Sequence, residues 1–181
     1  MPHTYFKPSA EHMLAALAQA QVAFDAGNLP IGAVIVHHDQ IIATGLNAID
    51  HPPDDTHHAE LRAIQSIAPF LAAHKGECTI YTTLEPCMMC LGAIINVGIC
   101  SVVIAAADSR VGALNLLDGG DYYRMKSGKL QVERGFMADE SQTLLNEYVR
   151  RTGGRPHLAS GAASHVAGAS GDRPRRPDGC G

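Results

Sequence analysis

The sequence predicts a three-layer α/β/α fold whose middle layer is a five-stranded mixed sheet. Two observations carry this prediction. Helical patterns alternate with short apolar runs along residues 1–152, and the runs at 78–84 and 101–107 are typical of strands buried on both faces. The composition agrees, because 46% hydrophobic and 18% charged residues indicate a globular chain rather than a disordered one.

Capping and turn residues define the elements of the first third of the chain. Ser9 can cap a helix that runs to about Ala26, with Gly27 as its stop. The apolar stripe of that helix is Met13, Leu14, Leu17, Val22 and Phe24. The apolar runs at 32–38 and 40–47 flank a single aspartate and predict a hairpin, and the Pro- and Asp-rich stretch that follows predicts a loop.

The remaining elements continue the alternation. A helix is predicted from about His57 to Ile67, and Pro86 suits the first turn of a later helix that ends near Asn96. The two buried strands lie between and after these helices. A fifth strand is expected at Leu130–Arg134, and a last helix, over about 138–151, turns Leu144, Leu145 and Tyr148 inward. Its two terminal arginines are favourable at a helix C-terminus.

Charge and cysteine content exclude several classes of protein. A formal net charge of −4 and a pI near 6.2 exclude a generally basic protein that coats nucleic acid, though not a local basic patch. Five cysteines, an odd number, argue against a disulfide framework and indicate a reducing cytoplasm. The N-terminus lacks the apolar core of a signal peptide, and the longest apolar stretch, 91–107, is interrupted by polar residues, so no membrane span is expected.

The composition changes at the C-terminus. Residues 153–181 consist mostly of Gly, Ala, Ser, Pro and Arg, which predicts a flexible low-complexity tail after one domain over residues 1–152. The tail has four arginines and two aspartates, a charge of +2, and so leaves −6 on the domain. It is interpreted as a solvated tail, and a weak nucleic-acid tether is the alternative.

Two short segments carry the chemistry. His58 and Glu60 lie at the start of one predicted helix, and Pro86, Cys87 and Cys90 lie at the start of another. Cysteines three apart on a helix face the same way, and a helix N-terminus favours the thiolate that binds zinc. Two thiolates and one imidazole make the three-ligand set of a catalytic zinc site, which leaves the fourth position for water. Glu60 points elsewhere than His58, so it is suited to moving a proton rather than to binding the metal.

Each of these assignments has an alternative. The paired cysteines alone could be a redox pair or half of a structural zinc knuckle, and His57 could replace its neighbour as a ligand. The site as a whole could also belong to a non-catalytic, zinc-stabilised binding module. The presence of Glu60 argues against this alternative. Cys78 and Cys100 are interpreted as core residues. Residues with weaker signals are His51 as a rim residue, Tyr122 and Tyr123 as a stacking or packed pair, Cys180 as an inert tail thiol, and Met88, Met89, Ile94 and Ile95 as core or subunit interface.

The motif H-x-E followed by P-C-x-x-C is that of zinc deaminases. The chain resembles the cytidine deaminase superfamily, and within it the branch of tRNA adenosine deaminases and small guanine and cytosine deaminases. The resemblance runs from about Pro30 to Tyr148. Its pieces are LPIGAVIV (29–36), TGLN (44–47), THHAELRAI (56–64), TLEPCMMCLGAI (83–94), VVIAAAD (102–108) and GFMADES (135–141).

The resemblance implies a cytidine-deaminase-like fold, one zinc ion per chain, and hydrolytic deamination, in which water replaces the amino group of a base and ammonia leaves. It implies His58, Cys87 and Cys90 as zinc ligands and Glu60 as the proton shuttle. It further implies that substrate contacts come from the Asn47 amide, the Ala59 N–H, the carbonyl of Glu85 or Pro86, and Asp108. Asn47 could instead end its strand, and Asp108 could merely cap a turn. A homodimer is also implied.

The substrate is less determined than the reaction. The expected substrate is a small free base or nucleoside, as in guanine or cytosine deaminases, and the alternative is wobble adenosine in tRNA. Overall likeness favours tRNA. Against it stand the negative domain, the acidic loop 48–56, and Ser127-Gly128 where the tRNA branch has an Asn-His pair. The local basic clusters, taken as ordinary surface charge or as phosphate contacts, are Arg124, Lys126, Lys129 and Arg134, then Arg150 and Arg151.

Overall fold

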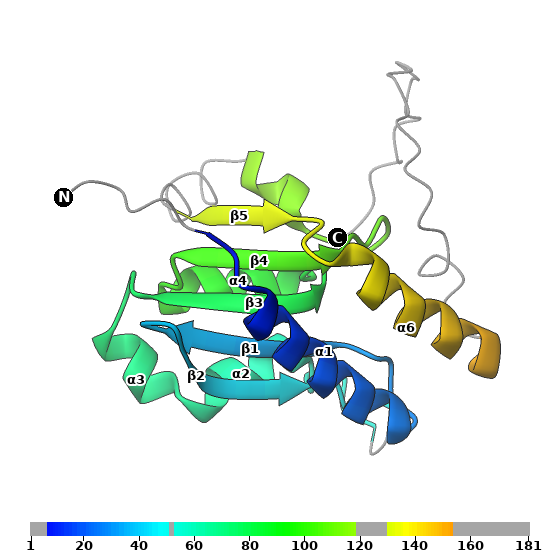
Figure 1. Cartoon of the computed structure of the whole chain (residues 1–181). Coiled ribbons are helices and arrows are strands. Elements are labelled where there is room, and N and C mark those ends of the chain that lie inside the picture. Colours follow the sequence, from blue (N-terminus) through cyan, green and yellow to red (C-terminus); the bar gives the residue numbers. More distant parts are fainter. Residues whose placement is uncertain (1–6, 51–52, 119–129, 154–181) are drawn as a thin grey trace, which may run out of the picture.

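The computed structural model describes residues 7–50, 53–118 and 130–153 (Figure 1). Its elements are α1 (Ala10–Asp25), β1 (Gly32–His37), β2 (Gln40–Leu46), α2 (Ala59–Ser66), α3 (Ala68–Ala73), β3 (Cys78–Leu84), α4 (Met88–Val97), β4 (Ser101–Ala106), the 3₁₀ helix η1 (Leu114–Asp118), β5 (Gln131–Arg134) and α6 (Ala138–Thr152). Every predicted strand is present, and the predicted helices are present with changed bounds.

The five strands form one mixed sheet in the order β2-β1-β3-β4-β5. The β1–β2 hairpin and the β1–β3 pair are antiparallel, whereas β3, β4 and β5 run parallel. The hairpin turns at His38 and Asp39, which both have positive φ, at 45° and 65°. The predicted five-stranded mixed sheet is therefore confirmed.

Helices cover both faces of the sheet (Figure 1). α1 and α6 lie together on one face, and α2, α3 and α4 lie on the other. The α1 face is packed mainly by a small cluster that includes Met13, Val34, Tyr81 and Val103, while the larger cluster lies between the sheet and α2 and α4. The expected three-layer α/β/α arrangement, with the sheet in the middle, is confirmed.

Two glycines let helices approach the sheet closely. A Cβ at Gly45 of β2 would lie 2.0 Å from the Ala59 carbonyl oxygen of α2, and one at Gly32 of β1 would lie 2.1 Å from the Ala16 carbonyl oxygen of α1. Both distances are far below any real contact. Gly45 therefore determines how near the start of α2, with its site residues, sits to the sheet.

Three predictions about helices need correction. The helix predicted over 57–67 is shorter, and a separate helix, α3, follows it because the backbone bends at Ile67 (φ −131°, ψ 25°) before Pro69. Pro86 precedes the N-cap of α4 rather than lying in its first turn. Leu14 and Val22 are 54% and 50% exposed, since the buried stripe of α1 combines the predicted Met13, Leu17 and Phe24 with His12 and three alanines.

Some predictions fall outside the described residues. The tail beyond Gly153, the segment 119–129 with Tyr122 and Tyr123, and His51 are among them. The predicted domain end at residue 152 coincides with the end of α6. Among the described residues, no helix has the length and apolar character needed to cross a membrane.

Candidate active site

The three predicted zinc ligands converge at the N-termini of two helices. His58 is the N-cap residue of α2, Cys87 is the N-cap residue of α4, and Cys90 lies in the first turn of α4. His58 Nδ1 is 3.6 Å from Cys87 Sγ and 3.5 Å from Cys90 Sγ. Because α2 and α4 pack side by side on one face of the sheet, residues about 30 apart in sequence share one point.

The donor set fits zinc. A tetrahedral ion with Zn–N near 2.05 Å and Zn–S near 2.3 Å places nitrogen and sulfur about 3.6 Å apart. The two distances from His58 Nδ1 match this separation. Cys90 is fully buried, whereas His58 and Cys87 are partly exposed, so the open side of the site lies next to those two residues.

The two thiols are electrostatically coupled. A hydrogen bond from the Cys90 thiol lowers the pKa of Cys87 to about 4. The same hydrogen bond, together with burial, raises the pKa of Cys90, because a second negative charge would lie beside the first. The protein by itself thus holds one thiolate and one thiol. A divalent cation supplies the positive charge that lets both become ligands.

Glu60 lies beside the metal ligands but is not one of them. Its side chain is only 3% exposed, and burial raises the pKa of the carboxyl. The Thr82 hydroxyl of β3 lies 3.1 Å from Glu60 Oε1 and 3.1 Å from the Leu84 carbonyl oxygen. A hydroxyl has one hydrogen, so it can donate to ionised Glu60, or donate to Leu84 and accept from protonated Glu60. This arrangement accommodates both forms of the carboxyl group.

Asn47 presents a buried acceptor. It follows β2, is 1% exposed, and its Nδ2 donates to the Leu29 carbonyl oxygen at 3.3 Å. That carbonyl can only accept, so the amide nitrogen must face it and Oδ1 must point away. Within the described residues Oδ1 has no partner. A buried acceptor without a donor is costly, and a substrate N–H or O–H would satisfy it.

The backbone groups expected to touch the substrate differ in availability. Ala59 is the first residue of α2, where helical N–H groups lack carbonyl partners within the helix. The Pro86 carbonyl oxygen already accepts a hydrogen bond from Ala113 N at 3.0 Å. A carbonyl oxygen has two lone pairs, so this hydrogen bond occupies only one of them.

Asp108 and the Glu85 side chain shape the loop over the site. Asp108 Oδ1 accepts hydrogen bonds from Arg110 N at 3.0 Å and Val111 N at 3.1 Å, which makes it the cap of a tight turn. Glu85 Oε1 accepts a hydrogen bond from Leu114 N at 3.2 Å. A Cβ at Gly112 would lie 2.6 Å from the carboxyl carbon and Oε1 of Glu85, so the turn packs tightly against Glu85.

The neighbouring candidates lie elsewhere. His57 Nε2 is 3.2 Å from Asp54 Oδ2, on the surface loop before α2. Cys78 is buried, but Cys100 is only partly so, and its thiol donates to the Cys78 carbonyl oxygen at 3.1 Å. Met88 and Met89 are 64% and 39% exposed at the start of α4, whereas Ile94 and Ile95 are buried, as predicted for core residues.

Two side chains that shape the active site, those of Thr82 and Glu85, were not predicted for this role from the sequence. Thr82 is fully buried in a strand that is otherwise mostly apolar. A threonine at such a position needs a hydrogen-bond partner, and this requirement was the available signal. Glu85 precedes the Pro-Cys motif directly, but only the folded chain brings the 108–114 loop to its carboxylate.

A comparison with protein families shows to which family this chain belongs. The model of the cytidine and deoxycytidylate deaminase zinc-binding region matches residues 7–106, which include all three cysteine and histidine ligands and Glu60. The chain belongs to this deaminase family. His58, Cys87 and Cys90 form the zinc site of a zinc-dependent deaminase, a hydrolase that acts on C–N bonds.

Relatives of this deaminase include enzymes named for tRNA. It is 38% identical over 142 residues to the tRNA-specific adenosine deaminase of Aquifex aeolicus, a match that covers 75% of this chain and 90% of the relative. It is also 38% identical to the chloroplastic tRNA(adenine(34)) deaminase of Arabidopsis thaliana. That match covers 60% of this chain and only 9% of the much longer plant protein.

Solved structures of deaminases share this fold. One, from work on A-to-I editing by tRNA:A34 deaminases at the wobble position, superimposes on this deaminase with a TM-score of 0.64 and 29% identity, covering 76% of this chain and all of the other. The guanine deaminase of Nitrosomonas europaea superimposes with a TM-score of 0.62 and 25% identity, covering 78% and 85%. The cytidine-deaminase-like fold expected from the sequence is thus confirmed.

Proposed function

We propose that this deaminase converts wobble adenosine in tRNA to inosine. The observation that carries this proposal is the 38% identity that extends over 90% of the Aquifex tRNA-specific adenosine deaminase. The proposal reverses the expectation of a free base or nucleoside, which rested on the negative domain, the acidic loop 48–56 and Ser127-Gly128 in place of an Asn-His pair. Negative charge on the domain weakens phosphate binding overall, but it does not prevent a few local contacts.

The residues around the metal ligands supply the proton chemistry. Zinc bound at this site supplies a water activated for attack near neutral pH. Glu60 takes one proton from the attacking water and delivers it to the ring nitrogen, and then takes the second proton from the hydroxyl on the attacked carbon and delivers it to the amino group, which leaves as ammonia. Its raised pKa suits both steps, because the carboxyl can be regenerated after each transfer. The net change is water in, ammonia out, with an oxo group on the ring.

Substrate positioning is assigned to three groups. The Ala59 N–H contacts the ring, and the Glu85 carbonyl oxygen accepts from the amino group that leaves. The buried Oδ1 of Asn47 accepts a hydrogen bond from the substrate. Asp108 acts by holding the loop over the base, since Oδ1 is already used by two backbone N–H groups.

Guanine is the second candidate substrate, and Asn47 favours it. Adenine carries no N–H on its six-membered ring, so when the amino group of adenosine faces the Glu85 carbonyl oxygen, a ribose hydroxyl is the donor left for Asn47 Oδ1. Guanine has N1–H and an amino group that can donate directly. The structural likeness to the Nitrosomonas guanine deaminase agrees with this candidate.

One assay separates the candidates. The zinc-loaded full chain is incubated with free guanine, free cytosine, adenosine, and an anticodon stem-loop that carries adenosine at the wobble position. We expect inosine in the stem-loop, with binding that weakens steeply as salt rises. Ammonia from guanine, with little salt effect and no inosine, would select guanine deaminase. Glu60→Gln is the control and should release no ammonia from guanine or from the stem-loop.

We also infer a homodimer and a cytoplasmic location. Met88, Met89 and Val111 are exposed apolar side chains, and the Cys87–Gly112 bridge brings the loop of Val111 to the start of α4. Such a patch favours a second copy of the chain. Met88→Glu should then reduce the mass measured by light scattering to that of the monomer. The four cysteines in the described residues are free, which agrees with a reducing compartment.

A further inference from the structure

Three histidines and a glutamate meet at the end of the sheet opposite the zinc site. His37 ends β1, His38 begins the hairpin turn, His74 ends α3, and Glu77 directly precedes β3. Cys87 lies beyond the other end of β3, and a strand of seven residues spans about 20 Å. We propose that His37, His74 and Glu77, with His38 as the fourth ligand, form a second, structural site for zinc or a similar divalent transition metal.

One carboxylate oxygen is the centre of the cluster. Glu77 Oε2 lies 3.1 Å from His37 Nε2, 3.3 Å from His74 Nδ1 and 3.9 Å from His38 Nε2. The donor atoms of His37, His74 and Glu77 all lie within 4.8 Å of one another. Ligand atoms about 2.05 Å from a tetrahedral ion are about 3.3 Å apart, so small side-chain rotations suffice to admit the ion.

The ligand chemistry selects the class of metal. Two imidazoles and a carboxylate make a set that zinc sites use, whereas magnesium and calcium require mostly oxygen ligands. Hydrogen bonds from His37 and His74 lower the pKa of the Glu77 carboxyl, so it is anionic at neutral pH. His38 is 78% exposed at its side chain and can therefore swing toward the ion as a fourth ligand.

The backbone holds these side chains in place before any metal binds. The β1–β3 pairing places His37 opposite Cys78, next to Glu77. Glu77 N donates to the His74 carbonyl oxygen at 3.2 Å, and the His74 ring stacks on Phe70 with centroids 4.1 Å apart. His37 contacts both of those rings edge-on. A preorganised set loses little conformational entropy on binding, and the metal would tie the hairpin turn to the end of α3.

Zinc content tests the proposal. The full chain is equilibrated with excess zinc and separated from free metal by gel filtration. Its zinc content per chain is then measured by elemental mass spectrometry. We expect the wild type to carry one more zinc per chain than the double variant His37→Asn/His74→Asn. The matched control, His157→Asn/His165→Asn, removes two histidines from the sequence beyond Gly153 and should keep the second zinc. Deaminase activity should be the same in all three proteins.

A second measurement covers the case in which the double variant does not fold. Zinc added beyond the first equivalent, to about a hundred times the dissociation constant, should raise the Tm of the wild type by about 5–10 °C, and that of Glu77→Gln hardly at all. The proposal is overturned if the wild type binds only one zinc, if the second zinc is lost in the control rather than in the cluster variant, or if Glu77→Gln responds like the wild type. None of these readouts depends on which base is deaminated.

Discussion

The Thr82 hydroxyl lies 3.1 Å from Glu60 Oε1 and links the central strand of the sheet to the first turn of α2. Both side chains are buried, so the hydrogen bond is shielded from water. It helps to hold the Glu60 carboxyl beside the metal ligands. The strand thus contributes to an active site whose other parts all come from helix ends and loops.

Thr82→Val tests this link, because valine has nearly the same shape but no hydroxyl. Loss of a hydrogen bond worth about 0.5–1.5 kcal/mol should lower kcat about three- to ten-fold. Zinc content should not change, since no metal ligand is touched. Thr79→Val, on the same strand but away from Glu60, is the control and should keep full activity. Equal kcat in the two variants would contradict the role given to Thr82.

Cys87→Ser should lose the active-site zinc, because a neutral hydroxyl replaces a thiolate ligand. In the His37→Asn/His74→Asn background, which lacks the proposed second site, chelation should therefore lower the Tm of the protein that keeps Cys87 but leave that of the Cys87→Ser protein unchanged, since zinc stabilises only the state that binds it. Cys100→Ser is the matched control: its thiol donates to a backbone carbonyl and lies outside the zinc site. Retained active-site zinc in Cys87→Ser would rule out this ligand.

Two glycine variants should act in opposite directions. Gly45→Ala places a Cβ 2.0 Å from the Ala59 carbonyl oxygen, so α2 must shift; overpacking of this kind costs about 1–3 kcal/mol. Zinc affinity should fall too, because α2 carries His58. Gly92→Ala in α4 meets nothing within 4 Å and should stabilise the helix by up to about 1 kcal/mol. Urea unfolding of both variants measures the difference, and two changes of the same sign would refute the packing argument.

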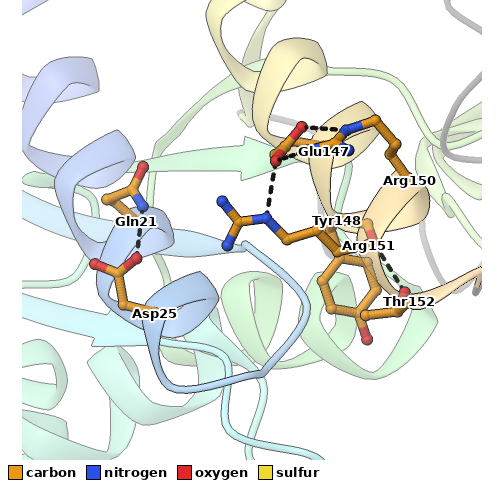
Figure 2. Close-up of polar contacts among 7 residues, drawn as sticks. All are labelled: Gln21, Asp25, Glu147, Tyr148, Arg150, Arg151 and Thr152. Carbon is orange, nitrogen blue, oxygen red and sulfur yellow. Dashed lines mark hydrogen bonds and ion pairs between the residues drawn. The ribbon is translucent and has the colours of Figure 1, made fainter.

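Glu147 should titrate well below the usual range of a carboxyl group. It accepts hydrogen bonds from Arg150 and Arg151 at 2.6 and 2.8 Å (Figure 2), which lowers the pKa of its carboxyl to about 2. The contribution to stability is then complete above the ordinary pKa of 4.5 and is lost as the pH falls toward 2. It is small, because the group is exposed.

A carboxyl-carbon NMR titration checks the Glu147 prediction directly. The wild type should titrate near the lowered pKa, and the double variant Arg150→Gln/Arg151→Gln near the ordinary value. The same two arginines were among the basic clusters considered for RNA contact. Both pair with Glu147 within α6, and Arg151 also lies 4.4 Å from the centroid of the Phe24 ring, so Arg151 links the end of α6 to α1. The positive charge of the two arginines is therefore partly neutralised by Glu147 within the protein.

Local patterns in the sequence determined the elements and the chemistry. Apolar runs gave all five strands within a residue or two, because burial on both faces leaves a clear signature in β3 and β4. The metal ligands could be named because zinc restricts the residue types and their spacing so strongly. The end of α2 and the existence of α3 were not predicted, although Pro69, two residues after the bend at Ile67, is a local signal that a helix is interrupted.

Only the tertiary structure decided which side chains meet. The strand order and the approach permitted by Gly45 bring Glu60 to Thr82, and the same sheet carries His37 to Glu77 across 40 residues. The orientation of the Asn47 amide follows from a carbonyl 18 residues away. Sequence patterns report each residue's own helix or strand, whereas these partners come from different elements, and their encounter depends on how the layers pack.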